Sequence, residues 1–159
     1  MHPLLQELYD YHHGASQIID ELSNLLIQVK HKPLSVPDIQ PIFNLLAILH
    51  SDEEQLHHQN EELIRQQLVA TDLPLHPRIQ DLENDHHGFD RIADHLKLLV
   101  DSELSLREMA AIIDDYIRKY YDHIDGEENI FFPMANKYLT DKDWEMIQQR
   151  WQTNEMITE

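Results

Sequence analysis

The segment HHQNEELI at residues 57–64 decides the fold, because it returns 66 residues later as HIDGEENI at residues 123–130. Each copy places a histidine four residues before a glutamate, a spacing that sets both side chains on one face of an α-helix. A second pair, LYDYHHG at residues 8–14 and LENDHHG at residues 82–88, repeats at an offset of 74. The repeats indicate two copies of one helical hairpin, each with a histidine on its first helix and a His-x-x-x-Glu motif on its second.

Hydrophobic residues recur at helical spacing along almost the whole chain, which indicates long amphipathic helices. The first helix is expected from Pro3 to Val29 and ends before the proline-containing stretch 31–41. Pro41 suits the first turn of a second helix that should run to about Leu68. The core-facing residues of this second helix are expected to be Phe43, Leu46, His50, Glu53, His57, Glu61, Ile64 and Leu68.

The second half of the chain predicts two more long helices. After a break at residues 71–77, a third helix should continue to about Val100. A capping box at Ser105-x-x-Glu108 starts the fourth helix. Pro133 should kink the last turns of that helix, because proline lacks the backbone N–H that a helix interior needs.

A short helix at residues 141–152, opened by the capping residue Thr140, completes the chain. Long helices joined by short connections are typical of an up-down-up-down bundle. We therefore predict an all-α fold, a four-helix bundle with a short C-terminal fifth helix. The whole chain, residues 1–159, is expected to form a single domain with hairpin repeats at about residues 3–70 and 77–137.

Charge and composition exclude several classes of partner and site. The chain has 30 Asp and Glu against 12 Lys and Arg, a formal charge of −18, so a phosphate backbone or an anionic membrane would repel it. With no cysteine, it forms neither disulfides nor thiolate metal sites. No apolar run reaches membrane-spanning length and residues 1–3 begin no signal peptide, so we expect a cytoplasmic protein without nucleic-acid or membrane partners.

Twelve histidines in so small a chain need an explanation. Histidines on the first and third helices are expected to face the core, as are both His-x-x-x-Glu motifs. Together they give four imidazole and two carboxylate donors: His12, His57, Glu61, His86, His123 and Glu127. Buried unpaired glutamates are costly, and no basic residue lies on these faces to neutralise them, whereas metal ions would. The alternative is a polar network without metal.

Two metal ions use this donor set better than one. Each ion takes two histidines while both glutamates bridge, and a shared oxo or hydroxo group leaves about one open place per ion. Nitrogen and oxygen ligands without sulfur suit iron or manganese, with zinc also open. Because two bridging carboxylates favour iron, we expect a pair of iron ions.

A different ligand set deserves comparison. Glu54 and Glu83 each precede a core histidine by three residues, the Glu-x-x-His spacing of ferritin-like di-iron bundles. That arrangement also needs an inward glutamate on each remaining helix, and on the first helix Glu7 and Glu21 both lie off the core face. The ferritin-like assignment therefore fails there.

The remaining polar residues near the motifs are expected to play lesser parts. The histidines beside the core histidines should lie at the surface: His13, His58 and His87. Four residues are expected either to support the ligands from a second layer or to be ordinary polar residues at the edge of the bundle: Glu53, Asp85, Asp90 and His50.

These motifs resemble those of the hemerythrin-like, or HHE cation-binding, domain family. The resemblance covers about residues 4–152 and rests on His12, His57-x-x-x-Glu61-Glu62, Asp85-His86 and His123-x-x-x-Glu127-Glu128-Asn-Ile-Phe-Phe-Pro133. It implies a four-helix bundle with a non-haem di-iron centre, whose ligands match the six donors named above one for one.

Two positions relate the chain to branches of that family. Oxygen-carrying hemerythrins have a second histidine one turn after the third-helix ligand, where this chain has Asp90. They also end in His-x-x-x-x-Asp, where this chain has His123-x-x-x-Glu127. Four histidines with two glutamates resemble the repair-type branch, which acts on iron–sulfur centres damaged by nitric oxide or peroxide.

The resemblance implies family roles in oxygen binding, sensing, iron handling and repair. We therefore expect a di-iron protein that binds or reacts with a small oxidant, namely oxygen, peroxide or nitric oxide, in a stress response or in iron-centre repair. Two alternatives stay open: a metal-dependent oxygen or redox sensor without turnover, and an iron store or donor. The sequence indicates no particular protein partner.

Overall fold

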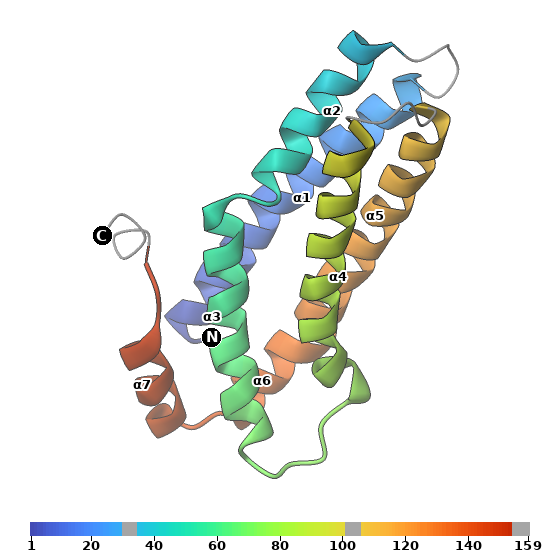
Figure 1. The fold of residues 1–159 in the computed structure, drawn as a ribbon. Coiled ribbons are helices and arrows are strands. Elements are labelled where there is room, and N and C mark those ends of the chain that lie inside the picture. The colour runs from blue at the N-terminus through green and yellow to red at the C-terminus, as the bar shows by residue number, and fades with distance from the viewer. Residues whose placement is uncertain (30–34, 101–105, 154–159) are drawn as a thin grey trace.

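The computed structural model describes residues 1–29, 35–100 and 106–153, and the regular structure in those ranges is entirely helical (Figure 1). Within those ranges, seven α-helices and one π-helical turn, η1, follow one another. Their bounds are α1 Pro3–Val29, α2 Val36–Ile48, α3 Asp52–Val69, α4 Pro77–Val100, α5 Leu106–Gly126, η1 Glu127–Phe131, α6 Phe132–Tyr138 and α7 Asp141–Arg150.

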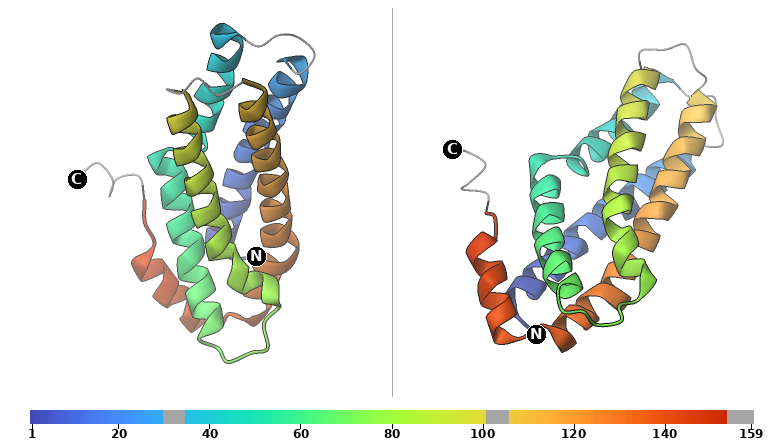
Figure 2. Two further views of the ribbon diagram at one scale, coloured as in Figure 1. Left: turned by 45° about the vertical axis from the view of Figure 1, so that its right-hand side comes forward. Right: turned by 60° about the horizontal axis from the view of Figure 1, so that its bottom comes forward.

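Four arms of the molecule run side by side: α1, the pair α2–α3, α4, and α5 with its continuation η1–α6 (Figures 1 and 2). Successive arms run in opposite directions, and α1 packs against both α2 and α5 while α4 packs against α5. The predicted all-α, up-down-up-down bundle is therefore confirmed. Among the described residues, no helix has the combination of length and apolar character that crossing a bilayer requires.

The second arm differs from the sequence prediction at its start. It begins at Val36 rather than with Pro41 in its first turn, and Pro41 lies inside α2. The reason is a helix start at Ser35, whose backbone N–H donates to the Asp38 carboxylate at 3.1 Å. The Asp38 carboxylate thus accepts hydrogen bonds from the backbone N–H and the hydroxyl of Ser35. Such a cap stabilises a helix start at this position, which is closer to the N-terminus than predicted.

The same arm is also interrupted in its middle, where one continuous helix was predicted. Helix α2 ends at Ile48, and Ser51 caps α3 by accepting a hydrogen bond from the Glu54 N–H. The interruption changes which residues face inward. Glu53, expected on the core face, is exposed, and Glu54 is buried instead with 1 % of its surface exposed.

The fourth arm is irregular close to the predicted kink. Helix α5 passes into the π-helical turn η1 and then into α6, whose first turn contains Pro133. Proline cannot donate the ordinary helical hydrogen bond, and a π-turn just before it accommodates that loss. Ser105 of the expected capping box lies outside the described residues. The predicted cap of the short helix is confirmed, because Thr140 accepts a hydrogen bond from the Asp143 N–H.

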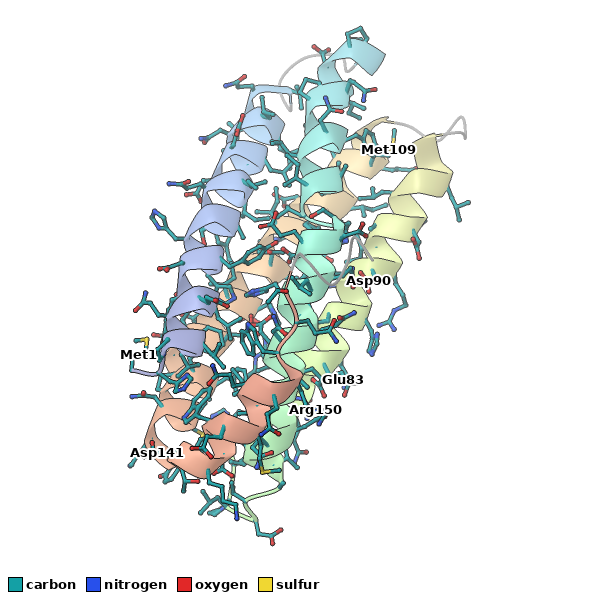
Figure 3. The ribbon with its side chains drawn as sticks, turned by 90° about the vertical axis from the view of Figure 1, so that its left-hand side faces the viewer. Met1, Glu83, Asp90, Met109, Asp141 and Arg150 are labelled. Carbon is teal, nitrogen blue, oxygen red and sulfur yellow. The ribbon has the colours of Figure 1, made fainter. Side chains whose placement is uncertain are left out.

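Two apolar clusters fill the interior and lie on either side of a polar layer. The cluster nearer the C-terminal end of α1, called the upper cluster, contains Ile19, Leu22, Ile42, Ile113, Tyr116 and their neighbours. The lower cluster contains Leu5, Ile64, Ile79, Phe132, Trp144 and their neighbours. Helix α7, whose ends Asp141 and Arg150 are labelled in Figure 3, covers the lower cluster against α3.

Candidate metal centre

The polar layer between the clusters contains all six residues that the repeat singled out, and all six are buried. Their donor atoms form two overlapping groups, within each of which the atoms lie no more than 4.8 Å apart. The first group is His12, His57, Glu61 and Glu127, and the second is Glu61, His86, His123 and Glu127. Each hairpin thus brings two histidines to one group, and the two groups share both glutamates.

The four imidazoles all approach the layer through the same ring atom, Nε2. Nε2 of His57 lies 3.0 Å from Oε1 of Glu61, and Nε2 of His123 lies 2.9 Å from Oε1 of Glu127. Nε2 of His12 lies 3.2 Å from the same Glu127 oxygen. The Nε2 atoms of His86 and His123 face each other at 3.0 Å. Nitrogen and oxygen lone pairs therefore converge from every arm on a common interior.

The two shared glutamates carry the clearest sign of an added group. Glu61 and Glu127 are each 1 % exposed, and none of their four carboxylate oxygens has a hydrogen-bond partner within the described residues. Leaving one buried polar atom unsatisfied costs about 1–3 kcal/mol, and more when it is charged. Imidazole nitrogens lie close to these oxygens but outside hydrogen-bond geometry, as ligands around a shared ion do. The residues fit bound metal ions.

Burial and neighbouring charges shift the pKa values of the ionisable groups in the layer in different directions. Burial opposes a charge on His12, but contact with Glu127 and other carboxylates outweighs it and raises the pKa of His12 well above its usual value. Glu127 in the same way outweighs burial at His123 and raises the pKa of that imidazole to about 10. Burial, then the charge on His12, lowers the pKa of His57 to about 3. Burial and the neighbouring Glu127 raise the pKa of Glu61.

Carboxylates hold the outer nitrogen, Nδ1, of one histidine in each group. Nδ1 of His123 lies 2.9 Å from the Asp85 carboxylate, which the Arg78 guanidinium meets at 2.6 Å. Nδ1 of His12 lies 3.3 Å from Oε1 of Glu128. Such contacts fix the orientation of a metal-binding histidine and increase its basicity. Asp85 was among the predicted second-layer residues, whereas Glu128 was missed although the Glu-Glu pair recurs in both repeats.

The other two histidines of the layer are covered by stacked rings. Tyr11 stacks on His57 with ring centroids 4.1 Å apart, and His58 stacks on His86 at 3.8 Å. His58 is therefore half-buried, which corrects its predicted surface position. The His58 ring lies on the side of α3 that faces α4. The prediction considered only the residues that point to the centre of the bundle, so it did not include this side.

The remaining second-layer candidates lie elsewhere. Glu53 is exposed at the start of α3. Asp90 accepts a hydrogen bond from the Gln55 amide at 3.2 Å, and His50 lies with Nε2 3.0 Å from the Tyr116 hydroxyl. His50 and Tyr116 therefore belong to the level of the upper cluster.

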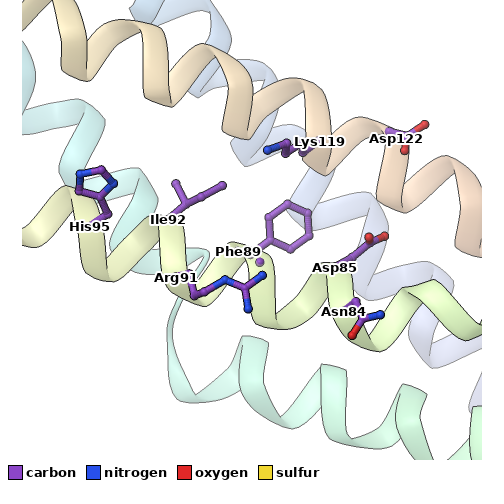
Figure 4. A pocket seen from close by; sticks show the side chains of 9 residues that line it. Asn84, Asp85, Phe89, Arg91, Ile92, His95, Lys119 and Asp122 are labelled. Carbon is purple, nitrogen blue, oxygen red and sulfur yellow. The ribbon is translucent and has the colours of Figure 1, made fainter.

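Two surface hollows lie next to the polar layer. A groove of about 540 Å³ between α4 and α5 is lined by Asp85 and Phe89 and by the cationic Arg91 and Lys119 (Figure 4). A smaller pocket of about 260 Å³ reaches the edge of the layer at His57.

The C-terminal segment forms one wall of the smaller pocket. Tyr11 and Asn60 line it together with Trp151 and Gln152. The buried Asn60 amide donates to the Gln152 carbonyl at 3.0 Å and accepts from the Gln152 N–H at 2.9 Å. These two hydrogen bonds hold the segment beside the layer.

Comparison with known proteins gives one match. The family model for the hemerythrin HHE cation binding domain matches residues 4–135, which is most of the chain. No curated protein and no solved structure matches.

Proposed function

The chain belongs to the hemerythrin HHE cation-binding domain family, and from that premise we propose that it is a non-haem di-iron protein that binds or reacts with a small oxidant. The oxidant is oxygen, peroxide or nitric oxide, and the setting is a cytoplasmic stress response or iron-centre repair. Binding of metal ions is what the family implies. The iron pair and its oxidant are our proposal.

The geometry suggests which residues would hold each ion. Nε2 atoms of His12 and His57 would bind one ion, and those of His86 and His123 the other. Glu61 and Glu127 would bridge the pair, since both belong to each group. Nitrogen and oxygen donors without sulfur suit iron or manganese, with zinc also fitting. Iron held in this way supplies one-electron redox chemistry to a small molecule.

One observation carries the proposal: four buried carboxylate oxygens, without a hydrogen-bond partner in the described part of the chain, lie among four converging Nε2 atoms. A non-metallic polar network would use those oxygens as hydrogen-bond acceptors. The protein's own residues exclude bulk water from the layer and orient the imidazoles through Asp85 and Glu128. A diatomic molecule or peroxide is small enough to enter the pocket of about 260 Å³ that reaches the edge of the layer at His57.

Metal content tests the ligand assignment directly. We expect about two iron equivalents in the parent protein and far fewer in the His57→Ala/His123→Ala variant. The matched control is His13→Ala/His87→Ala, which also removes two repeat-related histidines, but exposed ones. Equal metal content in the two double variants would overturn the assignment.

The reaction with an oxidant needs a separate experiment. Stopped-flow spectra of the reduced, iron-loaded protein mixed with oxygen or nitric oxide should show a rapid change that depends on oxidant concentration. Multiple turnovers indicate an enzyme, and a stable reversible adduct indicates binding. Absence of any spectral change, together with transfer of iron to an apo-acceptor, would support a store or donor and overturn the oxidant proposal.

A sensor is the second candidate, and the π-turn favours it. Glu127 is the first residue of η1, which leads directly into Phe131 and Phe132 of the lower cluster. A shift of Glu127 on a change of metal state would therefore be passed to α6. Single π-turns occur frequently at functional sites. A change in backbone hydrogen exchange at residues 127–138 between oxidised and reduced protein would support this candidate.

A further inference from the structure

A third buried glutamate lies beside the candidate metal centre without belonging to it. Glu54, in the first turn of α3, is 1 % exposed and is a member of neither ligand group. A buried carboxylate is costly unless it is paired, so its partners reveal what it does.

Three side chains from three arms of the bundle contact the Glu54 carboxylate. The Tyr120 hydroxyl donates to Oε1 at 2.8 Å, and the Tyr11 hydroxyl donates to Oε2. Nε2 of His58 lies 3.0 Å from Oε1. Burial alone would raise the pKa of Glu54, but His58, then His57 and Tyr11, outweigh burial and lower it to about 2. Glu54 is therefore a fixed negative charge at neutral pH.

The same partners connect Glu54 to both halves of the metal centre. The Tyr11 ring stacks on His57 of the first group, and the His58 ring stacks on His86 of the second. One carboxylate thus anchors the two rings that cover one histidine in each group.

We propose that Glu54 is a positioning residue and a fixed counter-charge that lowers the reduction potential of the metal pair. Each electron that the pair accepts removes one unit of positive charge from the layer. A nearby negative charge in a medium of low dielectric constant disfavours that loss, because it stabilises the more positive, oxidised state. The inference rests on the proposed function in requiring a redox-active metal pair.

Redox titration of the iron-loaded protein, followed by its absorption spectrum, tests the role of Glu54. Glu54→Gln removes the charge and should raise the midpoint potential while iron content stays at about two equivalents. Glu53→Gln is the matched control, because it removes the same charge from the adjacent exposed position and should leave the potential unchanged. An unchanged midpoint in Glu54→Gln, with iron bound, would overturn the proposal.

A second variant separates charge from loosened packing. Tyr120→Phe removes one donor to the carboxylate and keeps its charge, so the less neutralised Glu54 should lower the midpoint potential. An upward shift in Tyr120→Phe, or none, would mean that packing rather than charge sets the potential. This variant also decides the question if Glu54→Gln fails to fold. A parent protein that binds no iron would overturn the proposed function itself, a result distinct from either outcome above.

Discussion

The two halves of the candidate metal centre have the same donors but different surroundings. The first half uses His12 and His57 on α1 and α3, and the second uses His86 and His123 on α4 and α5. His57 is covered by the Tyr11 ring, whereas its repeat partner His123 is held at Nδ1 by the Asp85 carboxylate. The halves therefore match in their candidate ligands and differ in the residues that contact those ligands from outside.

The divergence follows the repeat position by position. At an offset of 74, Tyr11 corresponds to Asp85, and at an offset of 66, Glu54 corresponds to its own hydrogen-bond partner Tyr120. Glu128 contacts His12, while its counterpart Glu62 is engaged by Arg65. A duplicated hairpin thus kept its donors and changed their support, which would place the two ions in inequivalent environments.

The largest effect should come from a residue that both halves share. Glu127→Ala should remove nearly all metal, because the residue would bridge both ions, whereas His12→Ala should remove mainly the ion of the first half. Elemental analysis of the purified variants measures both. Glu62→Ala is the control, since its carboxylate pairs with Arg65 outside the layer. Retention of one full equivalent in Glu127→Ala would contradict a shared ligand.

The next largest effect should be a loss of metal affinity that differs between the two carboxylates in contact with histidine Nδ1 atoms, Asp85 and Glu128. Asp85→Asn should weaken binding of the second-half ion by roughly 10–100-fold, the usual cost of losing a partner of a metal-bound histidine. Glu128→Gln should cost less, because Glu128 is 35 % exposed and lies 3.3 Å from His12, whereas Asp85 is 25 % exposed and fixed by Arg78. Competition with a chelator measures both affinities. A greater loss in Glu128→Gln would reverse the comparison.

Lowering the pH should reduce the free energy of unfolding through Glu54, whose partners cover one histidine in each half. The folded-state pKa of Glu54 is about 2, below its usual value of 4.5, so its stabilising contribution is complete above pH 4.5 and is lost as pH falls toward 2. Between pH 5 and pH 3 this loss is on the order of 2 kcal/mol. Urea unfolding of protein stripped of metal should show that component in the parent and in Glu53→Gln. Its persistence in Glu54→Gln would assign the acid sensitivity elsewhere.

The smallest effect should come from the cap of α7, which packs on α3. Thr140→Ala removes the hydrogen bond to the Asp143 N–H and should lower the free energy of unfolding by about 1 kcal/mol. Metal content should stay the same, which chemical unfolding and elemental analysis together check. Loss of one ion in this variant would make α7 part of the support of the first half.

Periodicity and repetition were sufficient to predict the bundle, because hydrophobic residues recur at helical spacing in each long helix and each donor recurs at a fixed offset. They missed the interruption before Ser51, which moves Glu54 into the core and Glu53 out of it. A signal was present, since Ser51-x-x-Glu54 is itself a capping pattern.

Contacts between neighbouring helices were harder to predict. His58 and Tyr11 lie on helix flanks, and a residue beside the core line is buried only where another arm packs against it. Glu128 contacts His12 from the π-turn η1. The proline that follows is the only sequence signal for the wider helical geometry of that turn. Sequence spacing therefore predicts which residues face inward on one helix, but not which flank meets which neighbour.

The four unpartnered carboxylate oxygens have a consequence for the lifetime of the protein. In a chain folded without metal, these unsatisfied oxygens lower the free energy of unfolding. A free metal concentration 100 times the dissociation constant of one site would raise it by about 2.7 kcal/mol. Cellular proteases degrade the less stable form faster, because they act on transiently opened molecules. The abundance of this protein would then rise and fall with the supply of its metal, independently of how strongly its gene is transcribed.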